Sequence, residues 1–283
     1  MSAGRCGARH GAERSARGAT TRGLLVAVLL ALTPAAVSAT WSVIAVDLRT
    51  GRVVIASATC VPHERLLGFP AKGLMDIQAI VVPGIGVAAA QAGVDRTRAN
   101  QTLIYEQLQA GTPPRLIIDM LREDADVQQR QFAIVDMQGR SIGFSGRENR
   151  PASLSQQGEV PGTQIHYSVQ GNILASDAVV RNAAAALEST EGDILDKVMA
   201  AMEAADAAGG DARCTCDTEP VPDAPCDGRN AHVAYILAAD RADRRGSSFN
   251  DGEYALYIDV TDQNIQPTEN GNPVGPLRMI EIG

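Results

Sequence analysis

Two apolar stretches separated by a turn constrain the fold of this chain most. Residues 40–47 and 52–59 are rich in Val, Ile and Ala, and Leu48-Arg49-Thr50-Gly51 between them has the composition of a turn. This pattern predicts a β-hairpin. Few charges fall on either face of these strands or of the next two expected strands, 77–82 and 85–91. We therefore expect these four strands to form one sheet that is covered on both sides.

The remaining pattern alternates between helix pairs and strands. Helical spacing predicts four helices, at 95–110, 114–123, 177–189 and 193–207. Further strands are expected at 132–137, 141–144, 165–169, 232–239 and 254–260, with a polar loop at 147–162. Consecutive hairpins favour antiparallel sheets, and each helix pair needs a sheet face to cover. We predict an α+β fold, a four-layer αββα sandwich of two stacked, mainly antiparallel sheets flanked by helix pairs.

The first 39 residues have the three parts of a secretory signal peptide. Residues 1–22 contain five Arg and one Glu, residues 23–32 are apolar, and the small residues Val37 and Ala39 occupy the −3 and −1 positions of a cleavage site. The apolar run is about half the length of roughly 20 residues that a membrane-spanning helix requires. We expect residues 1–39 to be cleaved and residues 40–283 to form a single exported domain, periplasmic or extracellular, without a stable membrane anchor.

Charge and motifs limit the partners. Without residues 1–39, 20 basic and 32 acidic side chains remain, a formal charge of −12 with no basic run. Nucleic acid is therefore not an expected partner. The segment Gly84-Ile85-Gly86 lacks the third glycine of a dinucleotide-binding fingerprint, and no cofactor is expected. We expect a small-molecule substrate. Stacked-sheet domains often associate, so a homo-oligomer is a further candidate partner.

Four cysteines remain after the expected cleavage, namely Cys60, Cys214, Cys216 and Cys226. An even number in an oxidising compartment favours two disulfides. Because a bond between Cys214 and Cys216 would be strained, Cys60 pairs with one of these two, and the other pairs with Cys226. A zinc site, or Cys60 as a nucleophile, is less favoured, since the closest histidine in sequence is His232.

Cleavage after Ala39 would place a hydroxyl and a free α-amine on one residue, Thr40. An α-amine has a pKa of about 7.7 to 8.0, so a useful fraction is neutral at ordinary pH. Such a residue can serve as nucleophile and base together. The alternative is that Thr40 is merely the first residue of an edge strand, where a β-branched side chain fits well.

Several segments resemble a known family. They are Thr40-Trp41-Ser42-Val43-Ile44-Ala45, Ala89-Ala90-Gln91-Ala92, residues 169–175 and residues 204–213. In order along residues 40–282 they resemble the family called domain of unknown function 1028. The resemblance implies a place in the Ntn (N-terminal nucleophile) hydrolase superfamily, with its αββα sandwich. It also implies a nucleophile at Thr40, which signal peptidase would expose here.

The chain departs from that family's pattern at three places. Residues 214–227 interrupt the motif after Gly-Gly-Asp, so we expect a cysteine-bearing loop insertion at about 211–228. Asn230-Ala231 stand where Gln-Ser is usual, and Ala58 stands where a basic residue often follows Ala-Ser. These replacements favour an alternative function, a non-catalytic secreted module that binds a ligand or has a structural role on the same scaffold.

The leading prediction is an exported Ntn-type hydrolase that cleaves an amide-type bond through Thr40. This reaction also requires hydrogen-bond donors for the developing oxyanion. Asn172 and the backbone N–H groups of Gly171 and Asn172, expected at a strand-to-helix corner, are the candidates. Their alternative role is to turn the chain and cap the following helix.

Three further side chains are candidates for substrate binding. Gln91 could orient substrate from a neighbouring strand end, or be a buried polar group satisfied by backbone. Asp211 and Arg213 are expected to pair near the site. As a surface ion pair they would contribute only about 0 to 1 kcal/mol.

Overall fold

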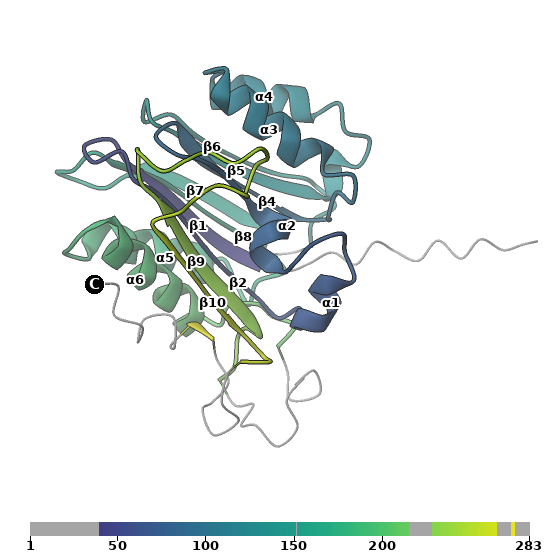
Figure 1. The fold of residues 1–283 in the computed structure, drawn as a ribbon. Coiled ribbons are helices and arrows are strands. Elements are labelled where there is room, and N and C mark those ends of the chain that lie inside the picture. Colours follow the sequence, from purple (N-terminus) through teal and green to yellow (C-terminus); the bar gives the residue numbers. More distant parts are fainter. Residues whose placement is uncertain (1–39, 151, 215–227, 265–272, 275–283) are drawn as a thin grey trace, which may run out of the picture. The chain divides into compact units, whose positions relative to one another are not determined.

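Two antiparallel sheets are stacked face to face between two helical layers (Figure 1). The computed structural model describes residues 40–150, 152–214, 228–264 and 273–274. The six-stranded sheet has the order β10-β9-β2-β1-β8-β7. Its strands are β1 (Thr40–Asp47), β2 (Val53–Thr59), β7 (Leu154–Glu159), β8 (Ile165–Asn172), β9 (Val233–Ala239) and β10 (Leu256–Thr261). The expected hairpin is present as β1 and β2, and Gly51 in its turn has a φ of +82°.

The four-stranded sheet has the order β3-β4-β5-β6. Its strands are β3 (Ala79–Val82), β4 (Gly86–Ala92), β5 (Arg130–Asp136) and β6 (Ser141–Ser145). All neighbouring strands in both sheets pair antiparallel. The predicted α+β sandwich of two stacked antiparallel sheets is confirmed.

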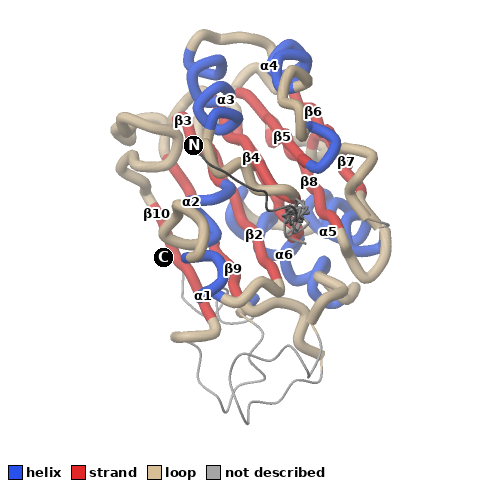
Figure 2. Tube along the Cα trace, turned by 90° about the vertical axis from the view of Figure 1, so that its right-hand side faces the viewer, coloured by secondary structure: helices blue, strands red, loops and turns tan. Residues whose placement is uncertain are grey.

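Each sheet has its own pair of long helices on its outer face (Figures 1 and 2). Helices α5 (Ala178–Ser189) and α6 (Ile194–Ala207) pack on the six-stranded sheet. Helices α3 (Ala99–Gln109) and α4 (Pro114–Leu121) pack on the four-stranded sheet. A capping box between Asp193 and Asp196 begins α6, which satisfies backbone N–H groups that have no partner inside the helix. Within the described residues, no helix has the length and apolar character needed to cross a membrane.

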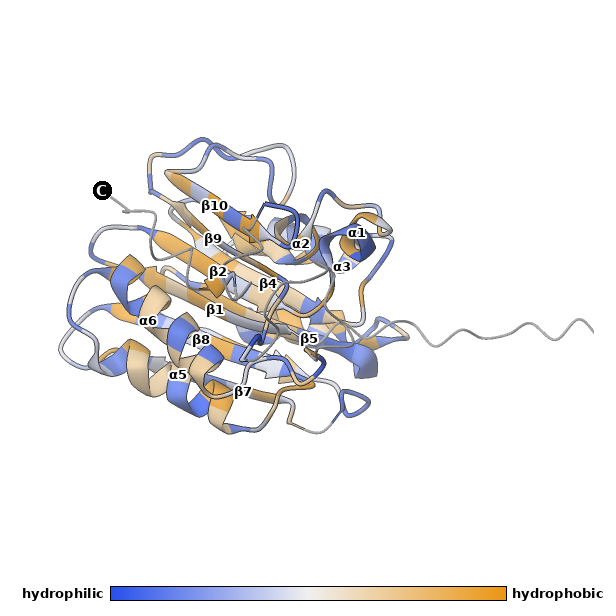
Figure 3. Cartoon of the chain, turned by 90° about the horizontal axis from the view of Figure 1, so that it is seen from below, coloured by the Kyte–Doolittle hydropathy of each residue, from blue (hydrophilic) through white to orange (hydrophobic). Residues whose placement is uncertain are grey.

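Alternation along β1 divides its side chains between two cores. Trp41, Val43 and Ala45 belong to the core under α5 and α6, whereas Ile44 and Val46 belong to the core between the sheets. Successive side chains of a strand point to opposite faces, so both faces of β1 are buried. Figure 3 shows the resulting apolar character, with β1, β2 and β9 coloured mainly orange.

The structure corrects four expectations about the elements. The four expected N-terminal strands do not share one sheet, because β1 and β2 lie in one and β3 and β4 in the other. The segment 77–82 begins as helix α2 (Leu74–Gln78), and α1 (His63–Leu67) was not expected. The polar segment 147–162 contains β7, an edge strand whose partly exposed residues lack an apolar alternation. The signal-peptide prediction falls on residues 1–39, outside the described residues.

Candidate active site

Thr40 begins β1, which is a central strand between β2 and β8. Its register partner on β8 is Asn172, and Trp41 next to it pairs with Ala58 on β2. The Thr40 side chain is 1% exposed. The alternative that Thr40 opens an edge strand is therefore wrong. Alternation places its hydroxyl on the face of the six-stranded sheet that covers the other sheet.

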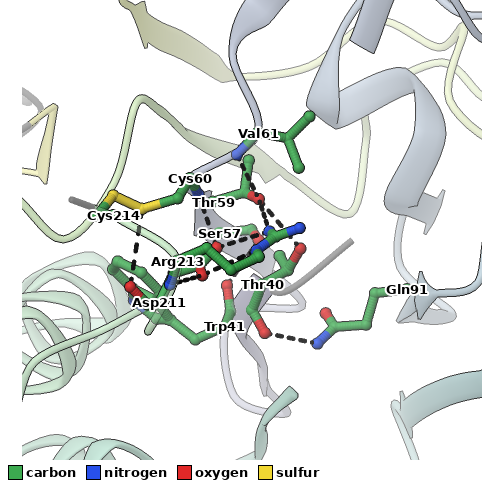
Figure 4. Close-up of polar contacts among 10 residues, drawn as sticks. All are labelled: Thr40, Trp41, Ser57, Thr59, Cys60, Val61, Gln91, Asp211, Arg213 and Cys214. Carbon is green, nitrogen blue, oxygen red and sulfur yellow. Dashed lines mark hydrogen bonds and ion pairs between the residues drawn. A yellow bond between two sulfur atoms is a disulfide. The ribbon is translucent and has the colours of Figure 1, made fainter. Parts of the chain in front are cut away.

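Thr59, which the sequence analysis did not single out, lies next to Thr40 at the end of β2. The two Oγ1 atoms are 3.5 Å apart, which is long for a hydrogen bond between hydroxyls. The Thr59 Oγ1 also accepts from the backbone N–H of Val61 at 3.2 Å and lies 3.4 Å from Nη2 of Arg213 (Figure 4). The sequence did contain a signal for this neighbour. In an antiparallel hairpin with its turn at residues 48–51, Thr59 lies across from Thr40.

Asp211 and Arg213 do pair near Thr40, but they do not form a surface ion pair. The Arg213 guanidinium binds the carboxylate through two nitrogens, with Nη2 2.7 Å from Oδ2 and Nε 3.1 Å from Oδ1. The same Oδ2 accepts from the backbone N–H of Cys60 at 2.8 Å. The Asp211 side chain is fully buried and that of Arg213 is 31% exposed. Removing one partner of such a pair leaves a buried charge, which is strongly destabilising.

A disulfide joins Cys60 to Cys214 across 154 positions of sequence. This is one of the two pairings that the sequence left open for Cys60. Cys216 and Cys226, with most of the expected loop insertion at 211–228, lie outside the described residues. The bond attaches the Asp211–Arg213 segment to the end of β2, beside Thr59 (Figure 4). Cys60 therefore carries no free thiol in this state.

Gln91 is a buried polar group at the inner face of β4, and it is 5% exposed. Its Oε1 accepts from Ser42 Oγ at 2.8 Å and from Gln78 Nε2 at 2.6 Å. Its Nε2 donates to the backbone carbonyl of Thr40 at 3.1 Å and to Gln131 Oε1 at 2.7 Å. Both amide atoms are therefore occupied by protein groups, only one of them backbone. The geometry supports a role in positioning Thr40 rather than contact with substrate.

Gln78 and Gln131 extend this network and were not identified from the sequence. Gln78 Oε1 accepts from the hydroxyl of Tyr235 at 2.9 Å, and Gln131 Nε2 donates to the carbonyl of Gly171 at 2.9 Å. All three glutamines are buried. Gln91 and Gln131 are direct partners across β4 and β5. Polar residues at matching strand positions were the available signal, but the strand pairing had to be known before it could be used.

Gly171 and Asn172 are the last residues of β8, not a corner between a strand and a helix. Helix α5 begins only at Ala178 with Asp177 in the N-cap position, so Asn172 does not cap it. Asn172 is fully buried on the Thr40 face of the sheet. The next residue, Ile173, has a φ of +52°. A β-branched residue rarely adopts this conformation.

Two residues that follow neighbours of Thr40 have a left-handed backbone conformation. Besides Ile173 after Asn172, Ala92 directly after Gln91 has a φ of +70°. Such residues cost on the order of 1–3 kcal/mol each, and they concentrate at functional sites. The two strained positions thus directly follow Gln91, which binds the Thr40 carbonyl, and Asn172, which pairs with Thr40 across the sheet.

A separate cavity of about 570 Å³ lies at the other end of β1, next to Asp47. Several of its charged lining residues have partners. Arg52 Nε is 2.7 Å from Asp240 Oδ1, and Lys197 Nζ donates to the carbonyl of Thr190. This cavity is distant along the strand from Thr40, and its hydrogen-bonded charges provide no activated nucleophile.

The comparison with protein families gives a match to residues 40–216, described as a family of unknown function (DUF1028). The match covers well over half of the chain. The chain belongs to the DUF1028 family. The match to DUF1028 begins at Thr40, the first residue of β1, and ends within the cysteine-bearing segment.

A solved structure of the DUF1028 family has a similar fold. It is the crystal structure of protein SPO2555 from Silicibacter pomeroyi, which is 20% identical. The similarity covers 86% of this chain and 87% of that chain, with a TM-score of 0.58. A search of curated proteins gives no match. The likeness supports the fold and carries no information about substrate.

Two of the residues that depart from the family pattern do not lie on the face of the six-stranded sheet that carries the Thr40 side chain. Ala58 and Ala231 are fully buried and belong to the core under α5 and α6. Ala58 is paired with Trp41, one position from Thr40 on the opposite face of the sheet. The replacement of a basic residue at Ala58 therefore removes no charge from the Thr40 face.

Proposed function

We propose that residues 40–283 are an exported N-terminal nucleophile hydrolase that cleaves an amide-type bond through Thr40. The proposal rests mainly on one observation. The hydroxyl of Thr40 heads a central strand between two stacked sheets, in a polar layer beside Thr59 and Arg213. The start of the family match at Thr40 supports it, because the shared sequence begins where the nucleophile would.

In the proposed reaction, Thr40 Oγ1 attacks the substrate carbonyl and the α-amine of Thr40 accepts its proton. The acyl-enzyme then reacts with water. The Arg213 guanidinium is next to the Thr59 hydroxyl and is paired with Asp211, so the proposed site is bordered by a compensated ion pair. An unperturbed α-amine has a pKa of about 7.7 to 8.0, so part of it is neutral and basic near neutral pH.

The oxyanion is assigned to donors from Asn172, with the backbone of Gly171 and Asn172 as the further candidates. Asn172 is the direct partner of Thr40 across the strand pair and is buried on the same face. Donors that are fixed before reaction and shielded from water stabilise developing charge most effectively. Gln91 and Gln131 hold Thr40 O and Gly171 O, which keeps both strands in register.

The deciding experiment maps the mature terminus and then varies it. Intact-mass analysis of exported protein is expected to give a chain that starts at Thr40. Two chains are then made by cleaving an N-terminal fusion, one starting at Thr40 and one carrying an additional Ala before it. An electrophilic β-lactone probe is expected to label only the first.

Equal labelling of the two chains, or a mature terminus elsewhere, would contradict the proposal. Export without labelling, together with saturable binding of a small molecule, would instead identify the alternative, a secreted binding module on the same scaffold.

A further inference from the structure

His232 lies beside the disulfide, although the three residues are far apart in sequence. Ligand atoms of Cys60, Cys214 and His232 all lie within 4.8 Å of one another. The backbone N–H of His232 donates to the carbonyl of Thr59 at 2.8 Å, which fixes the histidine next to Cys60. His232 is 1% exposed and Cys60 is 5% exposed. The fold has thus brought two sulfurs and an imidazole into one cluster, in which Cys60 and His232 are buried and Cys214 is half-buried.

We propose that the reduced form of this cluster binds a thiophilic divalent cation, with Zn²⁺ the best fit. Thiolates and imidazole are the preferred ligands of Zn²⁺. A dithiol reductant supplies two electrons and two protons, which break the Cys60–Cys214 bond and leave two thiols. Binding of the cation releases those two protons, and a neutral nitrogen of His232 provides the third ligand. Water completes a tetrahedral site.

The distances fit such a site. Zn–S bonds of about 2.3 Å and Zn–N bonds of about 2.0 Å place neighbouring ligand atoms roughly 3.3–3.8 Å apart. The ligand atoms already lie within 4.8 Å of one another, so the two sulfurs must separate and the imidazole nitrogen needs at most a small shift toward them. Cys214 is half-buried, whereas Cys60 lies at the end of β2. The movement therefore falls on the Cys214 side chain.

The metal and the disulfide would hold the same two segments together. Cys60 N donates to Asp211, and Arg213 follows Asp211 toward Thr59. Either the disulfide or the bound cation would keep this segment against β2. Oxidising conditions select the disulfide and reducing conditions with metal select the cation. The inference does not depend on the proposed hydrolase function.

The test uses the full chain with Cys6→Ser, Cys216→Ser and Cys226→Ser, so that Cys60 and Cys214 are its remaining thiols. Reduced, anaerobic protein is titrated with Co²⁺ as a spectroscopic probe and then with Zn²⁺ in competition. We expect one equivalent to bind with a thiolate-to-cobalt charge-transfer band. His232→Ala should weaken binding at least about tenfold, since even losses outside the first ligand shell often cost that much.

His166→Ala is the matched control, because His166 lies on β8 opposite Val46, far from the cluster. It should bind Co²⁺ like the parent. Cys214→Ser should abolish the band, and circular dichroism shows whether this variant is folded. The inference is overturned if reduced protein binds no metal, if the oxidised protein binds equally well, or if His232→Ala and His166→Ala behave alike.

Discussion

The two ends of the space between the sheets differ in chemistry although the same strands run through both. At one end, Ile44, Val46 and Ile55 pack with Val87 and Val135 in a mainly apolar layer. At the other end, β1 and β2 present Thr40, Ser42 and Thr59, and the facing strands present Gln91 and Gln131. Both ends are buried.

The apolar end contributes stability through burial, at about 25 cal/mol per Å² of apolar surface. The polar end gains little of this, because buried polar groups cost free energy unless they are hydrogen-bonded. Gln91 shows how the cost is limited, since both atoms of its amide have partners. A chain selected for stability alone would continue the apolar layer. The polar Thr40 end is the part of this space on which the proposed function depends.

The largest effect is expected for Thr40→Ala. It removes the proposed nucleophile, so labelling and turnover should fall by about 10³-fold or more. The free energy of unfolding should fall by only about 1–2 kcal/mol, because one buried hydroxyl and one buried methyl group are lost. Thr40→Ser keeps hydroxyl and amine and should retain labelling. Unchanged labelling of Thr40→Ala would show that Thr40 is not the nucleophile, and the polar end would then have no catalytic role.

At the apolar end, Ile55→Ala should have the opposite pattern. Ile55 is fully buried between the sheets, so the cavity should cost about 2–5 kcal/mol of unfolding free energy. Labelling of the folded fraction should be retained. Urea denaturation measures the first quantity, and Ile55→Val, with an expected cost of about 0.5–1.5 kcal/mol, is the graded control. A loss of labelling in folded Ile55→Ala would show that the two ends are not independent.

Gln91→Leu converts the polar end toward the apolar one. Four hydrogen bonds disappear, and Ser42, Gln78, Gln131 and the carbonyl of Thr40 lose a partner. We expect a loss of about 1–3 kcal/mol of unfolding free energy together with reduced labelling, because Thr40 is no longer held. Gln91→Glu keeps the acceptor and should label better than Gln91→Leu. A Leu variant as stable as the parent would mean that the network contributes nothing to folding.

The smallest effect is expected at the rim beyond the apolar end, where Arg52 pairs with Asp240. The hydrogen bond from Arg52 lowers the pKa of the Asp240 carboxyl. Arg52→Gln should therefore cost only about 0–1 kcal/mol, since the pair is partly exposed. A lowered pKa stabilises above the unfolded value of about 3.9, and this contribution disappears as the pH falls through the folded pKa. Denaturation at pH 7 and pH 3 should show the difference shrinking, and a constant difference would assign it to packing.

The sequence was sufficient where a local pattern determines the structure. Alternation and turn composition predicted the first hairpin, and apolar spacing with a cap predicted α5 and α6 to within a residue or two. It failed for β7, which is polar and partly exposed at a sheet edge. It also failed to separate the first four strands into two sheets, because a strand's own residues do not state which neighbour it pairs with.

The sequence by itself determined that Thr40 opens a strand with two buried faces, and that Gln91, Asn172, Asp211 and Arg213 merited attention. Only the tertiary structure decided what those residues touch. It placed Thr59 beside Thr40, turned Gln91 into a support for the Thr40 backbone, and brought His232 to a disulfide formed across 154 positions. The physical reason is that alternation is local and fixes which face a side chain occupies. Partners across strands and sheets depend instead on pairing between distant segments, which no local pattern encodes.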